Sequence, residues 1–235
     1  MPFGFGFYWD PTYILVIIGA VLSMMASSKV QTTFNRYSRV RSMTGMTGRE
    51  AAERLLRSQG ITDVRVEPVA GNLTDHYDPR NKVLRLSQST YGSSSVAAIG
   101  VAAHECGHAL QDYAGYVPLK IRGALVPAVN FGSMICWPLI LFGLFIRGGS
   151  ALINLGILVF CLAVLFQLVT LPVELNASKR AVVLLDQTGI LAGQEVEDTK
   201  KVLGAAALTY VAALAASILQ LLRILILVGG RRRDD

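Results

Sequence analysis

The chain has 235 residues, 52% of them hydrophobic, with a formal net charge of +6 and a mean hydropathy of +0.47. Such an apolar composition, gathered into runs of bilayer length, excludes an ordinary soluble protein and predicts a mainly helical α+β membrane protein with about four transmembrane segments. The positive charge does not imply a nucleic acid partner, because many basic residues flank the apolar runs, where anionic headgroups of the lipid bilayer are the natural partner.

The first apolar run covers residues 13–26 and follows an aromatic segment at residues 3–9 that suits a membrane interface. No Lys or Arg precedes the run, and no small-residue cleavage site leads into an obvious mature start. Residues 1–27 are therefore expected to be a membrane anchor rather than a cleaved signal peptide. The positive-inside rule places the amino terminus outside the cell and residues 28–122 in the cytoplasm. The basic residues behind this prediction are Lys29, Arg36, Arg39 and Arg41.

A soluble domain that starts with a helix and a strand is expected next. Residues 47–59 predict the helix, with a capping box between Thr47 and Glu50. The alternating residues 64–67 predict a strand that ends at Pro68.

Two further strands complete the predicted short β-sheet. Residues 73–78 and 82–86 flank a turn and predict a hairpin. The polar residues 87–95 predict a loop that leads into the next helix. A strand edge beside that helix matters for function, because it can pair with an extended peptide.

The most informative stretch is His-Glu-Cys-Gly-His at residues 104–108. Residues four apart on a helix share one face, about 6 Å from each other, so His104 and His108 can meet on a single metal ion. Glu105 then lies where it can take a proton from metal-bound water. This is the arrangement of zinc peptidases.

So short a motif also arises by chance, with packed or solvated histidines and a glutamate in a surface ion pair. The preceding residues 95–103 are small and apolar, however, and favour a buried helix. Unpaired polar groups are costly in a buried helix, so a bound metal ion explains the pattern better. Cys106 points away from the histidine face. It is not expected to be a ligand, and Cys136 and Cys161 are expected to be small buried hydrophobic residues of the membrane helices.

Two other polar residues near the motif have roles that the sequence leaves open. His76 is a zinc ligand, an oxyanion stabiliser at the edge of the site, or a hairpin histidine bonded to its acidic neighbours. Asp112 lies one turn beyond His108 and about 12 Å along the axis from His104, too far to share one ion with both. It can instead hold His108 in place.

A transmembrane hairpin is expected within residues 123–171. Its two apolar runs, residues 124–146 and 151–171, are joined by a tight turn at residues 147–150. Pro172 is then well placed to open a new helical segment.

Glu174 is the favoured third metal ligand. It shares one face of that helix with Ala177, Ser178 and Ala181, and small side chains let another helix approach closely. The alanine-rich helix that carries the motif is the obvious partner. The alternative is an interfacial carboxylate paired with a nearby Lys or Arg.

The last apolar run, residues 202–228, carries Gln220 and Arg223 and predicts either one tilted helix or a broken one. The basic residues within 172–201 predict that this region lies in the cytoplasm again. The arginines at residues 231–233 would then fall outside after a fourth crossing, which conflicts with the positive-inside rule.

The motif at residues 104–108, followed by Glu174-x-x-Ala177-Ser178, resembles the His-Glu-x-Gly-His and Glu-x-x-Ala-Asp pattern of HtpX-like and CAAX prenyl protease-like membrane metallopeptidases. Nearly the full chain resembles the YugP-type neutral zinc metallopeptidases, a bacterial family, most closely at residues 73–79 and 102–105.

This resemblance implies a gluzincin fold, with zinc held by His104, His108 and Glu174 and with Glu105 as the general base. Ser178 occupies the position where the broader pattern has Asp. A charged side chain that supports the zinc ligands is therefore not expected at this position, but the expected ligands are unchanged.

The prediction is therefore a multi-pass enzyme of the cell membrane, a zinc-dependent endopeptidase with one zinc ion per chain and its active site on the cytoplasmic side. Its substrates would be peptides, unfolded chains or membrane-protein segments. His76 and Tyr77 stay open as oxyanion donors, and Tyr210 is a weaker candidate because it lies in the last apolar run. The predicted divisions are an anchor (1–27), a zincin-like domain (28–122), a membrane hairpin (123–171), a helix with the third ligand (172–201) and a hydrophobic helix with a basic tail (202–235).

The competing prediction is a non-catalytic zinc-containing membrane partner or regulatory protein. A structural zinc is normally closed by four protein ligands. The chain offers few candidates for the fourth, chiefly His76 and Asp186, so an open catalytic site is favoured. A protein partner or a homo-oligomer stays open.

Overall fold

The structure, a computed structural model, describes residues 10–146 and 148–231. The aromatic segment at residues 3–9, and the arginines at positions 147, 232 and 233, lie outside these described residues.

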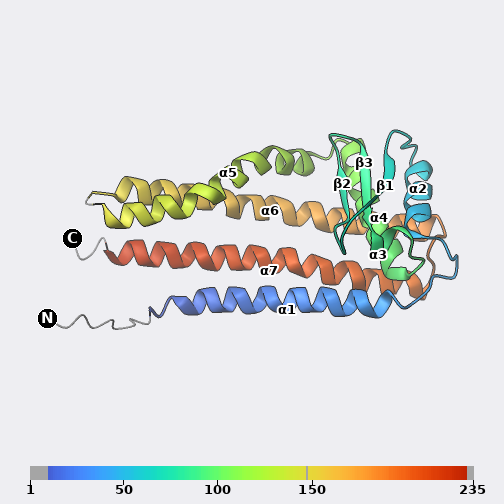
Figure 1. The fold of residues 1–235 in the computed structure, drawn as a ribbon, viewed down its shortest axis with the longest axis horizontal. Helices are drawn as coiled ribbons and strands as arrows, with labels where there is room; N and C mark the ends of the chain where they lie inside the picture. Colours follow the sequence, from blue (N-terminus) through green and yellow to red (C-terminus); the bar gives the residue numbers. More distant parts are fainter. Residues whose placement is uncertain (1–9, 147, 232–235) are drawn as a thin grey trace.

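Four helices in the described part of the chain are long and apolar enough to cross a membrane, which confirms the predicted α+β membrane protein. They lie roughly parallel, with α1 beside α7 and α5 beside α6 (Figure 1). The start of α1 and the end of α7 lie at the end of the bundle far from the β-sheet (Figure 1). The bounds are α1 Tyr13–Tyr37, α5 Val117–Phe145, α6 Ser150–Gln187 and α7 Gln194–Arg231.

The two longest helices reach well beyond a bilayer. Each has 38 residues, or about 57 Å at 1.5 Å per residue, whereas about 20 residues cross the hydrocarbon core. Pro172 lies inside α6, so the prediction that it opens a new helix is wrong. Neighbouring helices can satisfy the backbone group that a proline frees in such a helix. The last apolar run is likewise part of a single helix, α7.

The helix α5 begins at Val117, several residues before its apolar run. Tyr116 precedes it, and Pro118 occupies its first turn, where a missing N–H costs nothing. The residues of α5 that precede the apolar run, 117–123, include Arg122. They extend α5 toward the domain that contains the β-sheet.

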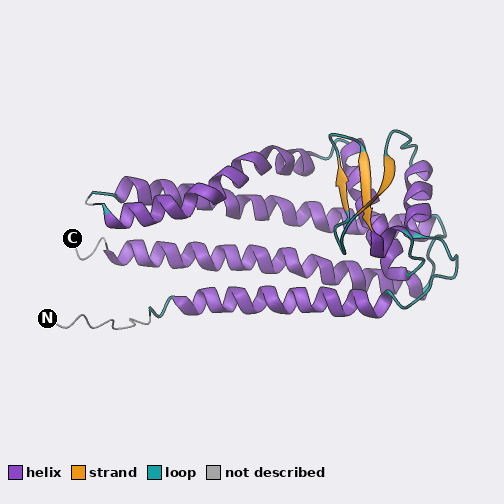
Figure 2. Cartoon of the chain, viewed as in Figure 1, coloured by secondary structure: helices purple, strands orange, loops and turns teal. Residues whose placement is uncertain are grey.

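The soluble part consists of short elements packed against the ends of α6 and α7 (Figure 2). The predicted helix is α2, Gly48–Ser58, and its capping box between Thr47 and Glu50 is present. The motif helix is α4, Val96–Tyr113. The predicted polar loop contains one helical turn, α3, Gln88–Tyr91, so that expectation was incomplete.

The β-sheet has three strands in the order β1-β3-β2. The predicted hairpin is confirmed, because β2 (His76–Asp78) pairs antiparallel with β3 (Val83–Ser87). The strand β1 (Arg65–Val69) pairs parallel with β3 and runs through Pro68, which corrects the prediction that Pro68 ends it. As an edge strand, β1 accommodates a proline whose missing N–H faces away from the ladder.

A single apolar core joins α2, the sheet, α4, the C-terminal end of α6 and the N-terminal end of α7 in one packed unit. Its fully buried members include Leu55, Leu84, Ile99, Leu185 and Leu191. Burying an aliphatic side chain of this size is worth about 1.5–3 kcal/mol. The core therefore holds α4 rigidly between the sheet and α6, which positions the motif.

Candidate metal centre

The motif lies on the most deeply buried helix of the soluble part. The hydroxyl of Ser95 accepts a hydrogen bond from the Ala98 N–H and caps the start of α4. Small alanine and glycine residues dominate its first half and allow neighbours to pack on every side. His104 and His108 lie one turn apart, with their ring centroids 4.8 Å from each other.

The helix α6 crosses α4 at unusually close range because both contribute small residues. A Cβ atom built on Gly107 would lie 2.5 Å from the carbonyl oxygen of Ala177. Ala177 and Ala181 are themselves fully buried. The expected close approach is confirmed, and it places Glu174 of α6 opposite both histidines.

Glu174 joins the two histidines in one cluster. Its Oε2 atom lies 3.2 Å from Nε2 of His104 and 3.5 Å from Nε2 of His108. The ligand atoms of the three residues all lie within 4.8 Å of one another. Glu174 is 2% exposed, so its charge must be balanced by neighbouring groups.

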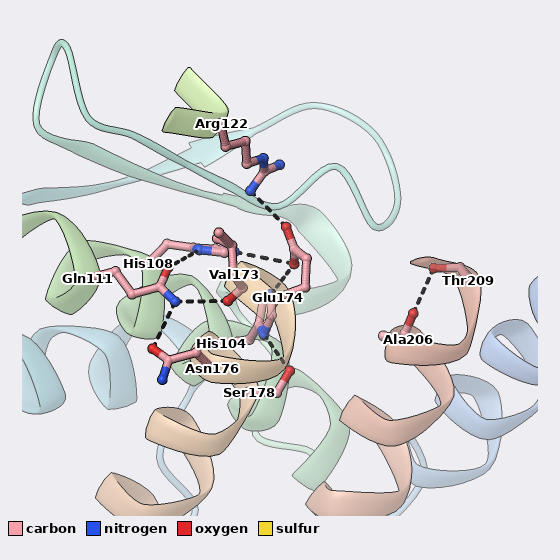
Figure 3. A network of polar contacts seen from close by, with 10 residues as sticks. All are labelled: His104, His108, Gln111, Arg122, Val173, Glu174, Asn176, Ser178, Ala206 and Thr209. Atoms are coloured by element: carbon pink, nitrogen blue, oxygen red, sulfur yellow. Dashed lines mark hydrogen bonds and ion pairs between the residues drawn. The ribbon is translucent and has the colours of Figure 1, made fainter. Parts of the chain in front are cut away.

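Each imidazole is fixed from behind by a hydrogen bond to its Nδ1 atom (Figure 3). Nδ1 of His104 lies 3.0 Å from Oγ of Ser178. Nδ1 of His108 lies 3.0 Å from Oε1 of Gln111. These contacts turn both Nε2 atoms toward Glu174.

The contacts of Gln111 determine the tautomer of His108. The Gln111 amide nitrogen donates to the carbonyl oxygen of Val173 and to Oδ1 of Asn176. Its Oε1 must therefore accept from Nδ1–H of His108, which leaves the Nε2 lone pair free for a metal ion. Burial opposes charging this ring, but the carboxylates of Glu174 and Glu105 outweigh that effect and raise the pKa of His108. The raised pKa indicates a negative potential that favours a cation here.

Arg122 completes the surroundings of Glu174. Its Nη1 donates to Oε1 of Glu174 at 2.8 Å (Figure 3). Oε2 is thereby left to face the two histidines. The first turns of α5 thus supply a positive charge that holds the carboxylate in one orientation.

Two cavities meet at the cluster. One has a volume of about 400 Å³ and opens between α5 and the hairpin, and the other, about 370 Å³, opens between α1 and α7. The residues that line both cavities are Asp75, His104, Glu105 and Tyr210.

Glu105 is the carboxylate best placed to act in these cavities. It is 8% exposed. Within residues 10–146 and 148–231, it takes part in no side-chain hydrogen bond or ion pair. A carboxylate without a partner that lines both cavities can accept a proton from a molecule bound there.

The hairpin forms one wall of the first cavity and is tied to the end of α4. The Tyr77 hydroxyl donates to Oδ2 of Asp112 at 2.9 Å, and Lys82 Nζ donates to the same oxygen at 2.6 Å. Asp112 therefore anchors the hairpin and does not hold His108. The suggestion that it does was wrong, because Gln111 takes that position one residue earlier on the helix.

The remaining predicted residues divide between the site and its surroundings. His76 lines the first cavity, where its Nδ1 lies 2.9 Å from the carbonyl oxygen of Thr74. Cys106 is fully buried on the opposite face of α4, with its thiol toward the carbonyl oxygen of Ala52. Cys136 is buried as expected, but Cys161 is exposed on the surface of α6, so the expectation that it is buried was wrong. Asp186 lines a different cavity, between α6 and α7.

Gln111 and Arg122 were not identified from the sequence. Gln111 follows His108 by three residues, a spacing that brings side chains together on a helix, so it was within reach of a sequence argument. Arg122 is a basic residue near a membrane segment, and only the crossing of α5 over α6 reveals its contact with Glu174.

The donor set suits zinc. Two imidazole nitrogens and one carboxylate oxygen are a known ligand combination of catalytic zinc sites, which leave the fourth position open. Hydrogen bonds behind each ligand, as at Ser178, Gln111 and Arg122, are typical of such sites.

Comparison with known proteins agrees with this geometry. A family model described as "Putative neutral zinc metallopeptidase" matches residues 12–229. The "Putative membrane protease YugP" of Bacillus subtilis (strain 168) is 48% identical over 221 residues, which cover 93% of this chain and 98% of the relative. No solved structure matches the chain. Because the match spans both the candidate membrane helices and the cluster of His104, His108 and Glu174, the chain belongs to the family of neutral zinc metallopeptidases.

Proposed function

We propose that the protein is a membrane-embedded zinc-dependent endopeptidase, in which His104, His108 and Glu174 hold one zinc ion per chain. One observation carries the proposal. Ligand atoms from two separate helices gather within 4.8 Å of one another, beside a cavity that also exposes Glu105.

The chemistry is peptide hydrolysis. A zinc ion held by these residues would supply Lewis-acid activation of water and of a peptide carbonyl group. Glu105 acts as general base and takes the proton of the attacking water on its carboxylate. It then delivers that proton to the nitrogen of the leaving amine.

Tyr210 is the favoured donor to the developing oxyanion. Of the three candidates from the sequence, it alone lines both cavities together with His104 and Glu105. The Tyr77 hydroxyl already donates to Asp112. His76 keeps a place at the edge of the site, where its Nε2 lies 3.4 Å from Arg85, and we assign it a secondary role in binding the substrate.

The substrate is an extended chain that crosses the two cavities. The strand β2 lies at an edge of the sheet, and its residues line the first cavity, so a peptide can pair with it by strand addition. The second cavity has apolar walls from α1 and α7 that suit apolar side chains.

The position of Glu174 supports cleavage close to the membrane surface. Glu174 follows the start of α6 by 24 residues, or about 36 Å, compared with a hydrocarbon core of about 30 Å. Residues 28–122 and 172–201 form the zinc domain in this proposal. Residues 1–27, 123–171 and 202–235 anchor it, with the active site facing the cytoplasm. Membrane-protein segments and unfolded chains at that surface are the proposed substrates.

A closed structural zinc site receives less support. It would need a fourth protein ligand. Among the residues that the structure describes, the cluster contains three, and a cavity borders it in place of a fourth.

The test compares Glu105→Gln with the wild type, both purified in detergent, in zinc analysis and in cleavage of an unstructured protein such as casein. The expected result is about one zinc per chain in both proteins and hydrolysis only in the wild type. Glu197→Gln is the matched control, because it changes an exposed glutamate that pairs with Lys200, and it should retain activity. Turnover by Glu105→Gln would refute the assignment of the base. Zinc that persists unchanged in Glu174→Ala would refute the ligand set.

A further inference from the structure

A cavity of about 480 Å³ lies between α1 and α7, apart from the candidate metal centre. None of its residues lines either cavity of that centre. Its lining residues are Lys29, Thr32, Thr33, Arg36 and Tyr37 of α1 and Lys201, Gly204, Ala205 and Leu208 of α7.

The cavity carries unbalanced positive charge. Lys201 pairs with Asp198 at 2.8 Å, so its charge is largely balanced. Lys29 and Arg36, in contrast, have no acidic partner within the part of the chain that the structure describes. The guanidinium of Arg36 lies 5.6 Å from the Tyr37 ring centroid, which holds it at the rim. Two cations on one helix therefore face a space that an anion can enter.

The depth of the cavity matches the level of lipid headgroups. Lys201 directly precedes the apolar run of residues 202–228 in α7, which is long enough to cross the hydrocarbon core. Lys201 therefore lies at the end of the apolar part of this helix, at the level where lipid headgroups lie.

The order of residues along the cavity follows the order of groups in a phospholipid. Leu208 follows Lys201 by seven residues and lies about 10 Å deeper in the membrane. Leu208 is 47% exposed, and an added Cβ at Gly204 would contact nothing within 4 Å. On the antiparallel α1, Lys29 precedes Arg36 by seven residues, so its Cα lies about 10 Å deeper than that of Arg36, at the level of Leu208. Arg36 and Lys201 form the cationic rim, and the long side chain of Lys29 can extend along the helix to reach it. This rim, the open surface at Gly204 and the apolar Leu208 below it fit a headgroup phosphate followed by an acyl chain.

We propose that this cavity is a binding site for an anionic phospholipid, whose phosphate lies between Lys29, Arg36 and Lys201 and whose acyl chain runs along Leu208. Basic pockets between membrane helices are known to bind such headgroups. A bound lipid would join α1 to α7, the two helices that also form the second cavity of the candidate metal centre. A free phosphate ion has the same headgroup chemistry but gains nothing from the apolar depth.

The test is native mass spectrometry of the full chain in a non-ionic detergent, titrated with phosphatidylglycerol and with phosphatidylcholine of the same acyl chains. The expected result is one tightly bound phosphatidylglycerol and much weaker binding of phosphatidylcholine. The double variant Lys29→Gln/Arg36→Gln should weaken phosphatidylglycerol binding by about 25-fold, at roughly fivefold for each basic residue near an anionic group. Gly204→Leu fills the cavity without changing the charge and should also weaken binding.

The matched control is Arg57→Gln/Arg65→Gln, which removes two exposed basic residues of the soluble domain and should bind phosphatidylglycerol as the wild type does. Equal binding of both lipids by the wild type would overturn the proposal. Equal losses in the control and the test variants would also overturn it, because they would indicate only a general effect of charge. Competition by millimolar inorganic phosphate would assign the site to a free anion instead of a lipid.

Discussion

Replacing Gly107 by alanine tests whether the close contact between α4 and α6 assembles the metal centre. The new Cβ would lie 2.5 Å from the carbonyl oxygen of Ala177, and 3.0 and 3.1 Å from its carbonyl carbon and Cα. All three are backbone atoms in a buried helix, so no side chain can rotate away. Ordinary contacts of a Cβ atom begin near 3.4 Å, and relief by separation alone would need about 0.9 Å of movement.

The effect on zinc should exceed the effect on stability. Overpacking costs about 1–3 kcal/mol, but alanine returns about 1 kcal/mol in helix propensity, so the net loss is at most about 2 kcal/mol. Metal sites, by comparison, tolerate changes of about 0.2 Å in ligand distances. Separating α4 from α6 by several tenths of an ångström moves both histidines away from Glu174. We expect zinc affinity to fall by tenfold or more, as when supporting contacts of a zinc site are removed.

The assay is competition for zinc with a chromophoric chelator, together with thermal unfolding of the purified protein. Gly204→Ala is the control, because the added methyl group meets nothing within 4 Å. It should leave zinc affinity unchanged and should not lower the unfolding temperature. Wild-type zinc affinity in Gly107→Ala would refute the argument that this contact sets the ligand geometry.

Three further predictions concern single side chains. Arg122→Gln removes the charged donor to Glu174 and should lower zinc affinity in the same assay by about 10- to 100-fold, whereas Arg122→Lys should lose less; no change in either variant would contradict the positioning role. Burial raises the pKa of Cys106, so maleimide labelling followed by peptide mapping should find it unmodified until the protein is denatured, and rapid labelling of the folded protein would contradict its placement. The Asn81 side chain, with Arg85 and backbone N–H groups, lowers the pKa of Asp78 to about 2; a carbon-13 NMR titration should find that midpoint. Because the pKa is lower in the folded state, Asp78 stabilises the hairpin above about pH 4, and this contribution is lost as the pH falls toward 2.

Local sequence patterns were enough to predict many of the helices and strands of this protein. The four apolar runs fixed the number of candidate membrane helices because the requirement for bilayer length acts on each run separately. The capping box at Thr47 and the hairpin around Asp78 followed from short-range hydrogen bonding. Local rules misjudged Pro68 and Pro172, because a proline is tolerated at a sheet edge and within a long membrane helix.

The sequence by itself determined the chemistry that is available, since the spacing of His104 and His108 on a helix makes them a metal-binding pair. Glu174 could be proposed from the small residues that share its face. Only the tertiary structure decided which neighbouring side chains contact these candidate ligands. Gln111 sets the tautomer of His108, and Arg122 orients Glu174. Asp112 holds the hairpin instead of a candidate ligand. The physical reason is that helix periodicity is a property of each segment. The distance between α4 and α6, in contrast, depends on how Gly107 and Ala177 pack within a core drawn from the whole soluble domain.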